Sequence, residues 1–241
     1  MSKKRVVVSW SSGKDSAWTL YRLRQRDDVE VVGLITTVNQ AFDRVAMHST
    51  RAQVLEAQVE AAGLPLRKIS LPWPCSNEQY ESCMIECVRA LKAEGVQAVA
   101  FGDLFLEDIR TYREINLAGS GLEPLFPLWL EPTDKLAREM ITGGLKAKLV
   151  CVDPKKLDPK FAGRDFDAQL LRDLPQPVDP CGENGEFHTC VYAGPMFGRE
   201  IPLILGEVVE RDGFVYCDAL VDSRAALAQS GWGRPLPHEP W

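Results

Sequence analysis

The sequence predicts an α/β protein: a doubly wound parallel sheet followed by a smaller C-terminal α+β domain. The main observation is an alternation of short β-branched runs with longer segments of helical periodicity over about the first hundred residues. Strand, helix and strand repeated in this order favour parallel strands covered by helices on both faces. Past about residue 125 this alternation stops and a candidate hairpin appears, which indicates a different architecture for the rest of the chain.

The elements of the first domain follow from their residues. Val6, Val7 and Val8 form a run that is typical of a buried strand. Ser76 and Gln79 form a capping box at the head of one helix. We expect strands at 5–10, 29–38, 66–71 and 96–101, separated by helices at 14–26, about 52–62 and 76–95.

The second domain carries weaker patterns. Thr133 caps a helix that ends at Gly143-Gly144. Further on we expect a strand at 149–152, a short helix near 167–174, and a hairpin of 201–209 and 214–221 that turns at Asp212-Gly213. The predicted domains are therefore 1–130 and 131–225, followed by an irregular tail at 226–241.

Composition limits the class of protein. The chain has 241 residues, 45% of them hydrophobic, and a formal net charge of -6, which argues against a surface built to coat nucleic acid. The apolar run after Lys3 and Lys4 is too short for a signal peptide or a membrane span, and the seven cysteines are odd in number. We expect a cytoplasmic protein that does not enter a membrane.

A candidate phosphate-binding loop, Ser11-Ser12-Gly13-Lys14-Asp15-Ser16, joins the first strand to the first helix. Small residues let the backbone approach phosphate oxygens, and the N–H groups and dipole of the helix N-terminus favour negative charge. Lys14 adds a full positive charge. The loop matches neither a Walker loop nor the dinucleotide fingerprint, and the simplest alternative is an ordinary polar turn between strand and helix.

The loop resembles the SGGKDS loop of the PP-loop ATP pyrophosphatases, enzymes with a doubly wound, HUP-like domain that adenylate a substrate and release pyrophosphate. Ser12 stands where that family usually has glycine, a substitution that is strained if the position needs a positive φ. Over roughly residues 5 to 222 the chain is similar to one branch, the diphthine–ammonia ligase family. The segments that carry this resemblance are Met47-His48, Gly102-Asp103 with Arg110 and Glu114, Pro127-Leu128-Trp129, Phe161-Ala162-Gly163-Arg164, and 182–189 (GENGEFHT).

This resemblance implies a reaction in which a carboxylate takes AMP from ATP and ammonia then displaces the AMP to give an amide. The implied partners are ATP, ammonia and a carboxylate acceptor, which in this family is diphthine, a modified histidine on a translation factor. Mg²⁺ would bridge phosphate oxygens, and Asp15 or Asp103 could hold it. Arg110 is followed by Arg113, whereas the family usually has two arginines spaced two apart.

The candidate residues form three overlapping sets. The proposed catalytic residues are Lys14, Asp15, Glu183 and Glu186. The proposed ATP-binding residues are Ser11, Ser12, Gly13, Lys14, Asp15, Ser16, His48, Gly102 and Asp103. The proposed acceptor-binding residues are Arg110, Glu114, Glu183, Glu186 and His188.

Each of these residues also has a structural interpretation. Glu183 and Glu186 could be an exposed acidic turn, His48 a structural histidine, and Asp103 a helix cap. The spacing of Cys181, His188 and Cys190 does not match a common zinc site.

Two other functions stay open. One is modification of tRNA, which the acidic charge and the absence of a Cys-x-x-Cys motif disfavour. The other is a nucleotide-binding regulatory module without turnover. The edge of the expected hairpin could also support a homo-oligomer.

Overall fold

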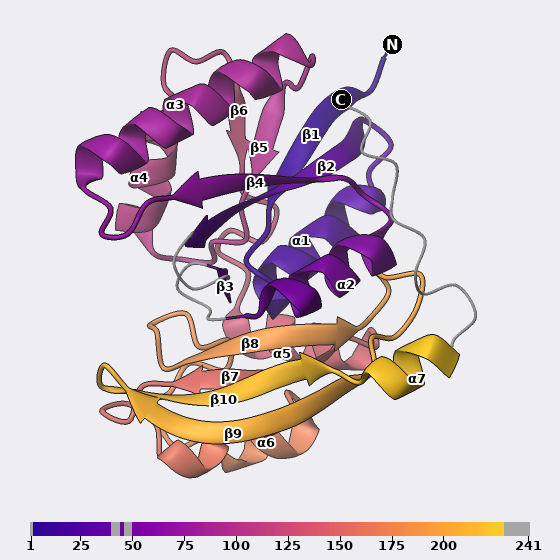
Figure 1. The fold of residues 1–241 in the computed structure, drawn as a ribbon, viewed down its shortest axis with the longest axis vertical. Coiled ribbons are helices and arrows are strands. Elements are labelled where there is room, and N and C mark those ends of the chain that lie inside the picture. Colours follow the sequence, from indigo (N-terminus) through magenta and orange to yellow (C-terminus); the bar gives the residue numbers. More distant parts are fainter. Residues whose placement is uncertain (1, 40–43, 46–49, 229–241) are drawn as a thin grey trace.

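The computed structural model describes residues 2–39, 44–45 and 50–228, which form two sheets, one above the other in Figure 1. The upper sheet has five parallel strands in the order β4-β2-β1-β5-β6, and a short strand, β3, pairs antiparallel with the end of β2. The strands are β1 (Lys4–Ser9), β2 (Val29–Asn39), β3 (Arg44–Val45), β4 (Leu66–Leu71), β5 (Ala98–Ala100) and β6 (Glu123–Leu125). The chain reverses its direction of winding between β1 and β5, and ligands bind at such a switch point in doubly wound sheets.

Helices cover both faces of this sheet, which confirms the doubly wound prediction (Figure 1). On β1, Val6 and Val8 pack with residues of α1 (Lys14–Arg24) and α2 (Ala52–Ala62). Val7 points to the other face and packs with residues of α3 (Asn77–Ala93) and α4 (Glu107–Leu117). All three valines are fully buried because the sheet has helices on both sides.

The lower sheet is antiparallel, in the order β8-β7-β10-β9. Its strands are β7 (Lys146–Val152), β8 (Phe187–Ala193), β9 (Leu203–Arg211) and β10 (Phe214–Val221). β9 and β10 form the predicted hairpin, and Asp212 and Gly213 at its turn have φ angles of 54° and 80°. The helices of this part are α5 (Thr133–Thr142), η1 (Pro159–Phe161), α6 (Ala168–Asp173) and α7 (Ser223–Ala228).

Six elements were not predicted: β3, α4, β6, η1, β8 and α7, of which α7 runs to Ala228 within the predicted irregular tail. Leu117 is the one buried residue of α4, and the apolar residues Ile109, Tyr112 and Ile115 of this helix are exposed. β8 begins at Phe187, inside a segment that the sequence suggested was an irregular loop. The upper sheet ends at Leu125 and the lower sheet begins at Lys146, and we keep a domain boundary near residue 130 as a proposal. The predicted tail lies outside the described residues from 229 onward.

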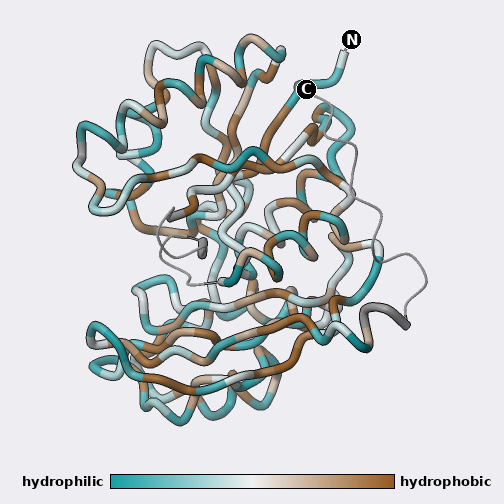
Figure 2. The backbone as a smooth tube through the Cα atoms, viewed as in Figure 1, coloured by the Kyte–Doolittle hydropathy of each residue, from teal (hydrophilic) through white to brown (hydrophobic). Residues whose placement is uncertain are grey.

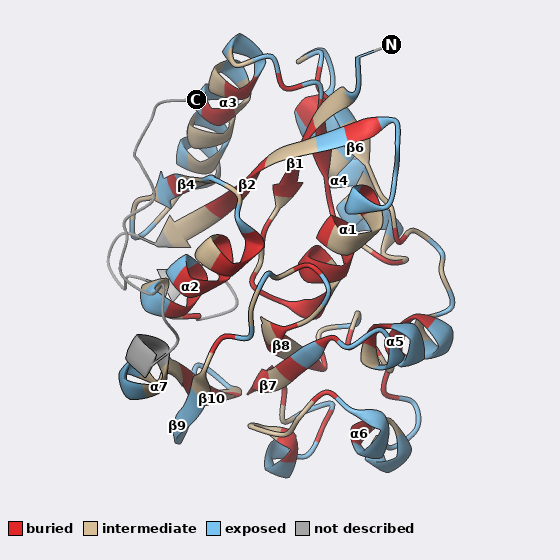
Figure 3. Ribbon diagram, turned by 90° about the vertical axis from the view of Figure 1, so that its right-hand side faces the viewer, coloured by how far each residue is buried: buried red, intermediate tan, exposed pale blue. Residues whose placement is uncertain are grey.

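One apolar core joins the two sheets. Trp18 of α1, Met140 of α5 and Leu149 of β7 belong to the same buried cluster. Figure 2 shows apolar segments along the strands of the upper sheet, and Figure 3 shows buried residues gathered in β1 and α1. Among the described residues, no helix combines the length and the apolar character needed to cross a membrane.

Candidate active site

The phosphate loop follows β1 and has a strained backbone. Ser12 has a φ of 70°, in the left-handed region that the sequence analysis identified as awkward for a residue other than glycine. Gly13 is extended (φ −90°, ψ 171°) and caps α1, which begins at Lys14. Ser16 donates from Oγ to the Gly13 carbonyl over 3.0 Å, and the Ser11 N–H donates to Ser16 Oγ over 3.3 Å. The loop therefore holds its shape partly through its own serines.

The second sheet fixes the other side of this loop. The Val191 N–H on β8 donates to the Ser12 carbonyl over 3.0 Å, and the Lys14 N–H donates to Thr189 Oγ1 over 3.1 Å. Gln58 of α2, which is fully buried, donates from Nε2 to the carbonyls of Ser12 and Val191 over 3.1 and 2.7 Å. The phosphate loop is thus bonded to the outer edge of the lower sheet, and both parts of the chain build it.

Lys14 is almost completely buried, at 3% exposure, which is unusual for a lysine. Its Nζ contacts both carboxylate oxygens of Asp15, over 2.9 and 2.8 Å, and lies 5.8 Å from the ring centres of Phe166 and Phe187. Burial alone would lower the pKa of Lys14, but the Asp15 carboxylate outweighs it and raises this pKa above 10.5. Lys14 is therefore a buried cation paired with the Asp15 carboxylate, in a surrounding where electrostatic interactions are strong.

Gly102 and Asp103 follow β5 and lie against the first turn of α1. A Cβ atom on Gly102 would come within 2.8 Å of the Asp15 carbonyl carbon, so a larger residue does not fit. Burial raises the pKa of the Asp103 carboxyl, although the Arg113 guanidinium, at 3.6 Å, opposes this effect. The Oδ2 atom of Asp103 is buried and has no hydrogen-bond partner. Arg113 itself lines the cleft, and it was not among the predicted site residues.

The turn before β8 faces this region from the lower sheet. Glu183 accepts a hydrogen bond from the Leu104 N–H over 2.8 Å, which links the turn to the segment after β5. Burial raises the pKa of Glu183 to about 7, with a smaller contribution from the nearby Asp15 charge. Glu183 thus holds its proton close to neutral pH, as a group that exchanges protons during catalysis should.

His188 and Glu186 differ in position although both belong to the segment 182–189. His188 lines the cleft, and burial together with the Lys14 charge lowers its pKa to about 4, so its ring is neutral. Glu186 is buried and does not line the cleft. Its Oε1 accepts from the Asp179 N–H and from Asn184 Nδ2, over 3.0 and 3.2 Å. Glu186 therefore holds the turn together, and its predicted contact with a substrate stays a prediction.

The cleft has a volume of about 200 Å³, and its described lining comes from the end of β1, the phosphate loop, the segment after β5, Arg113 of α4, the turn before β8 and the start of β8. A second pocket of about 300 Å³ adjoins it and shares Ser9, Ser11, Phe101 and Arg113 with it. This second pocket is mostly apolar and lies at the carboxyl end of β2, with Ile35 and Tyr80 in its wall. Together the two pockets offer a charged end and an apolar end, which suits a nucleotide.

Other predicted residues are not part of the cleft. Arg110 and Glu114 pair with each other on α4 over 2.8 Å. The Arg110 guanidinium stacks on Phe126 and Trp129, at 4.9 and 4.8 Å from their ring centres. The structure thus gives this pair a packing role and no contact with the phosphate loop. His48 lies outside the described residues. Within the described residues, no group of three or more His, Cys, Asp or Glu side chains is arranged to hold a metal ion.

Fold and site together define an α/β protein with a PP loop that an antiparallel sheet completes. Residues 4–123 match the diphthamide synthase N-terminal domain, and residues 132–217 match the diphthamide synthase C-terminal domain. The chain belongs to the diphthamide synthase family.

Curated relatives carry the name diphthine–ammonia ligase. The Homo sapiens protein is 27% identical over 228 residues, which cover 85% of this chain and 85% of that protein. The Danio rerio protein is 27% identical over 226 residues, covering 85% and 88%. The Schizosaccharomyces pombe protein is 32% identical over 232 residues, which cover 88% of this chain but 38% of that longer protein.

Proposed function

We propose that this protein is an ATP-dependent ligase that converts a carboxylate to an amide with ammonia, and that the acceptor is diphthine on a translation factor. The named relatives suggest this acceptor. The observation that carries the proposal is the buried Lys14 in the phosphate loop, with Glu183 lining the same cleft. A cation and a carboxyl group that exchanges its proton near pH 7 serve the two halves of such a reaction.

In the first half, an oxygen of the acceptor carboxylate attacks the α-phosphorus of ATP. The bond from this phosphorus to the bridging oxygen breaks, and pyrophosphate leaves with the electron pair. The Lys14 ammonium and the positive end of the α1 dipole stabilise the charge that develops on the leaving group. The apolar walls around Lys14 strengthen this attraction because they exclude water.

In the second half, ammonia attacks the carbonyl carbon of the acyl adenylate. The bond from this carbon to the AMP oxygen breaks, AMP leaves, and the nitrogen must lose a proton. We assign that proton to the Glu183 carboxylate, because its raised pKa of about 7 makes it a suitable acceptor at neutral pH.

The residues at the cleft also fit a bound Mg²⁺ ion. The Oδ2 atom of Asp103 is buried without a hydrogen bond, and Asp15 supplies a second carboxylate next to the loop. Mg²⁺ prefers one or two carboxylates together with phosphate oxygens, so we propose Asp103 and Asp15 as its protein ligands. When bound, the ion would neutralise charge on the phosphates.

The test uses ATP labelled at the α-phosphate, together with ammonium and a translation factor that carries unamidated diphthine. We expect labelled AMP, and an acceptor whose mass shows that its carboxyl group has become an amide. Lys14→Met should abolish both products, whereas Lys160→Met, at a side chain that is 71% exposed, should leave them unchanged. Intact ATP or ADP as the sole nucleotide product would overturn the proposal, and so would a Lys14→Met variant with wild-type activity.

We also propose that the chain self-associates through β9. This strand pairs with β10 on one side, and Val208 and Val209 on it are 57% and 45% exposed. Exposed apolar edge strands favour pairing with another strand. Sedimentation of the wild type beside Val208→Lys tests this idea, and a monomer at all concentrations would refute it.

A further inference from the structure

A groove of about 490 Å³, here named the helix groove, lies between α3 and α4. These two helices lie next to each other at the upper left of Figure 1. The described lining of the groove is mostly apolar and includes Met84, Ile85 and Val88 of α3 and Ile115 and Leu117 of α4. Ile85 and Ile115 are 52% and 66% exposed. Large apolar side chains that gather at an exposed groove mark an interaction site.

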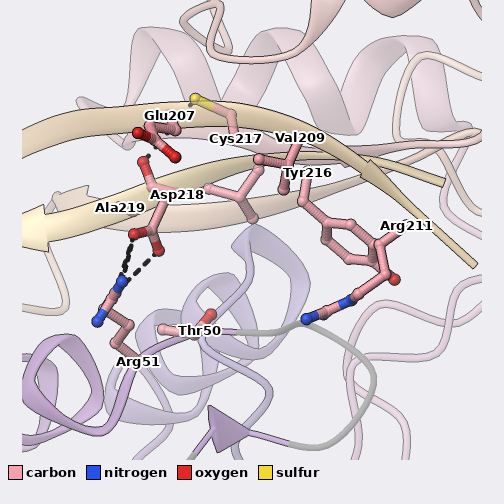
Figure 4. Close-up of a pocket in the computed structure, with 10 residues that line it drawn as sticks. Thr50, Arg51, Glu207, Val209, Arg211, Tyr216, Cys217, Asp218 and Ala219 are labelled. Carbon is pink, nitrogen blue, oxygen red and sulfur yellow. Dashed lines mark hydrogen bonds and ion pairs between the residues drawn. The ribbon is translucent and has the colours of Figure 1, made fainter.

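The pocket between the start of α2 and the β9–β10 hairpin, drawn in Figure 4, is smaller, at about 190 Å³. Two guanidinium groups, of Arg51 and Arg211, and two carboxylates, of Glu207 and Asp218, line it. Arg51 donates to Asp218 over 2.6 Å, and Arg211 lies 3.6 Å from the Asp212 carboxylate. This pocket therefore offers a ligand no net charge, and its arginines already have partners.

The helix groove adjoins the cleft around Lys14. Phe101 and Arg113 line the groove, the cleft and the apolar pocket next to the cleft. The Arg113 guanidinium lies 5.0 Å from the ring centre of Phe101 and 3.6 Å from the Asp103 carboxylate, so this arginine stands at the junction. Tyr80 also belongs to both the groove and the apolar pocket. A segment that occupies the groove is therefore next to the cleft.

The end of the helix groove that is farther from the cleft carries positive charge. Arg89 and Lys92 line the groove three positions apart on α3, so they share one face of this helix. Within the described part of the chain, neither side chain has an ion pair or a hydrogen bond. Glu81 is the one carboxylate in the described lining, and it lies about 16 Å from Lys92 along the helix. In a chain with a net charge of -6, two unpaired cations at one end of a groove favour an acidic partner.

The walls of the groove determine which kind of segment fits. They are side chains of two α-helices, whose backbone groups are bonded within the helices, so the walls provide no strand edge with which a peptide could pair. The partner must then satisfy its own backbone groups, and an amphipathic helix does so while it presents an apolar face. Tyr80 near the cleft and Lys92 at the far end are about 18 Å apart along α3, a distance that a partner helix covers in about twelve residues.

We propose that the helix groove docks an amphipathic helix of the acceptor polypeptide. Its apolar face packs on Ile85 and Ile115, and an acidic residue at one end of it meets Arg89 and Lys92. The modified residue of the same polypeptide then lies in the adjoining cleft. A small free carboxylate has no part that reaches the groove, so docking favours a protein-borne acceptor. This inference rests on the proposed function, which places amidation in the cleft.

Ile115→Ser tests the apolar contact. We expect about tenfold weaker binding of the diphthine-bearing translation factor and a KM for this factor raised to the same extent, because the variant loses a buried apolar contact of the complex. Ile204→Ser is the matched control, since that side chain is 47% exposed on β9 of the lower sheet. Both variants should keep the wild-type kcat and the wild-type KM for ATP.

Arg89→Glu combined with Lys92→Glu tests the basic end of the groove. We expect at least tenfold weaker binding of the factor at low salt, and a Kd that depends less on salt than that of the wild type. Arg138→Glu on α5 is the matched control, because that side chain is 70% exposed, and it should bind the factor as the wild type does. Melting temperatures close to that of the wild type show that lost binding is not lost folding.

The outcomes separate the two proposals. If the wild type amidates the factor and the groove variants keep its Kd and KM, the groove has no part in docking, and the proposed function stands. If the wild type binds the factor through the groove but forms neither AMP nor amide, the proposed function fails, and the docking site stands. If the groove variants lose self-association in sedimentation while their Kd for the factor is unchanged, a second copy of the chain covers the groove, and the inference is overturned.

Discussion

Replacing Gly102 by alanine tests how closely the segment after β5 must approach the start of α1. The new Cβ would lie 2.8 and 2.9 Å from the carbonyl carbon and oxygen of Asp15, and 3.0 Å from the Ser16 nitrogen. All three atoms belong to the backbone at the start of α1, so no flexible side chain can move away. Reaching an ordinary contact of 3.4 Å requires a shift of about 0.6 Å between β5 and the phosphate loop.

That shift has two measurable consequences. Overpacking of this kind destabilises a protein by about 1–3 kcal/mol. A misplacement of about 1 Å can reduce an enzymatic rate about a hundredfold, so a shift of this size should reduce AMP formation about tenfold.

Gly198→Ala is the matched control, because its Cβ would meet one atom, the Ala61 carbonyl oxygen, at an ordinary 3.6 Å. Urea unfolding and the labelled-ATP assay compare the two variants. Equal unfolding free energies and equal rates would refute the claim that the close approach matters.

Three further substitutions test the residues that hold the phosphate loop and line the cleft. Ser12→Gly should raise the unfolding free energy by about 1 kcal/mol in urea titrations. The substitution places glycine at a φ of 70°, where serine is strained, and removes a buried hydroxyl without a hydrogen-bond partner. An unchanged unfolding midpoint would contradict this. Gln58→Leu should cost about 3 kcal/mol by the same measurement, since it removes the side-chain partners of the Val191 carbonyl and of the buried Trp10 indole N–H. A loss well below 1 kcal/mol would show that water replaces the amide. The pKa of Glu183 is raised from 4.5 to about 7, so the folded protein binds a proton there that the unfolded chain has already lost. The contribution of Glu183 to the unfolding free energy is therefore complete below about pH 4.5 and is lost as the pH rises to about 7. Glu183→Gln should flatten this part of the profile of unfolding free energy against pH, and an unaltered profile would remove the basis for the assigned proton transfer.

The sequence predicts β1, β2, β4 and β5 of the upper sheet because their signals are local, whereas it misses the short strands β3 and β6. The Val6–Val8 run and the Ser76–Gln79 capping box both appear in the structure as predicted. The phosphate loop was also identifiable, because six residues in order stand between a strand and a helix. β8 was missed because its first residues overlap a glycine-rich turn, and its pairing partner, β7, lies about forty residues earlier in the chain.

The rest of the site depends on contacts between residues distant in sequence. Arg113 lines the cleft because its place on α4 brings its guanidinium to Asp103, and an isolated arginine in the sequence gives no sign of that. Arg110, about one turn earlier, stacks on Phe126 and Trp129 and does not line the cleft. The hydrogen bond from Lys14 to Thr189 spans 175 residues. No local pattern predicts such a pair, although the family resemblance drew attention to the segment that contains Thr189.

The contact between β8 and the phosphate loop explains why the site needs both sheets. At the start of a helix the first N–H groups have no partners inside the helix, and a phosphate usually takes them. Here Thr189 takes the N–H of Lys14, and Val191 donates to the carbonyl of the strained Ser12. The lower sheet therefore holds the loop in a conformation that its own residues do not favour. It also supplies Phe187 beside Lys14 and Glu183 in the cleft wall. The loop that would bind the nucleotide and the turn that would receive the proton are consequently fixed by the same strand.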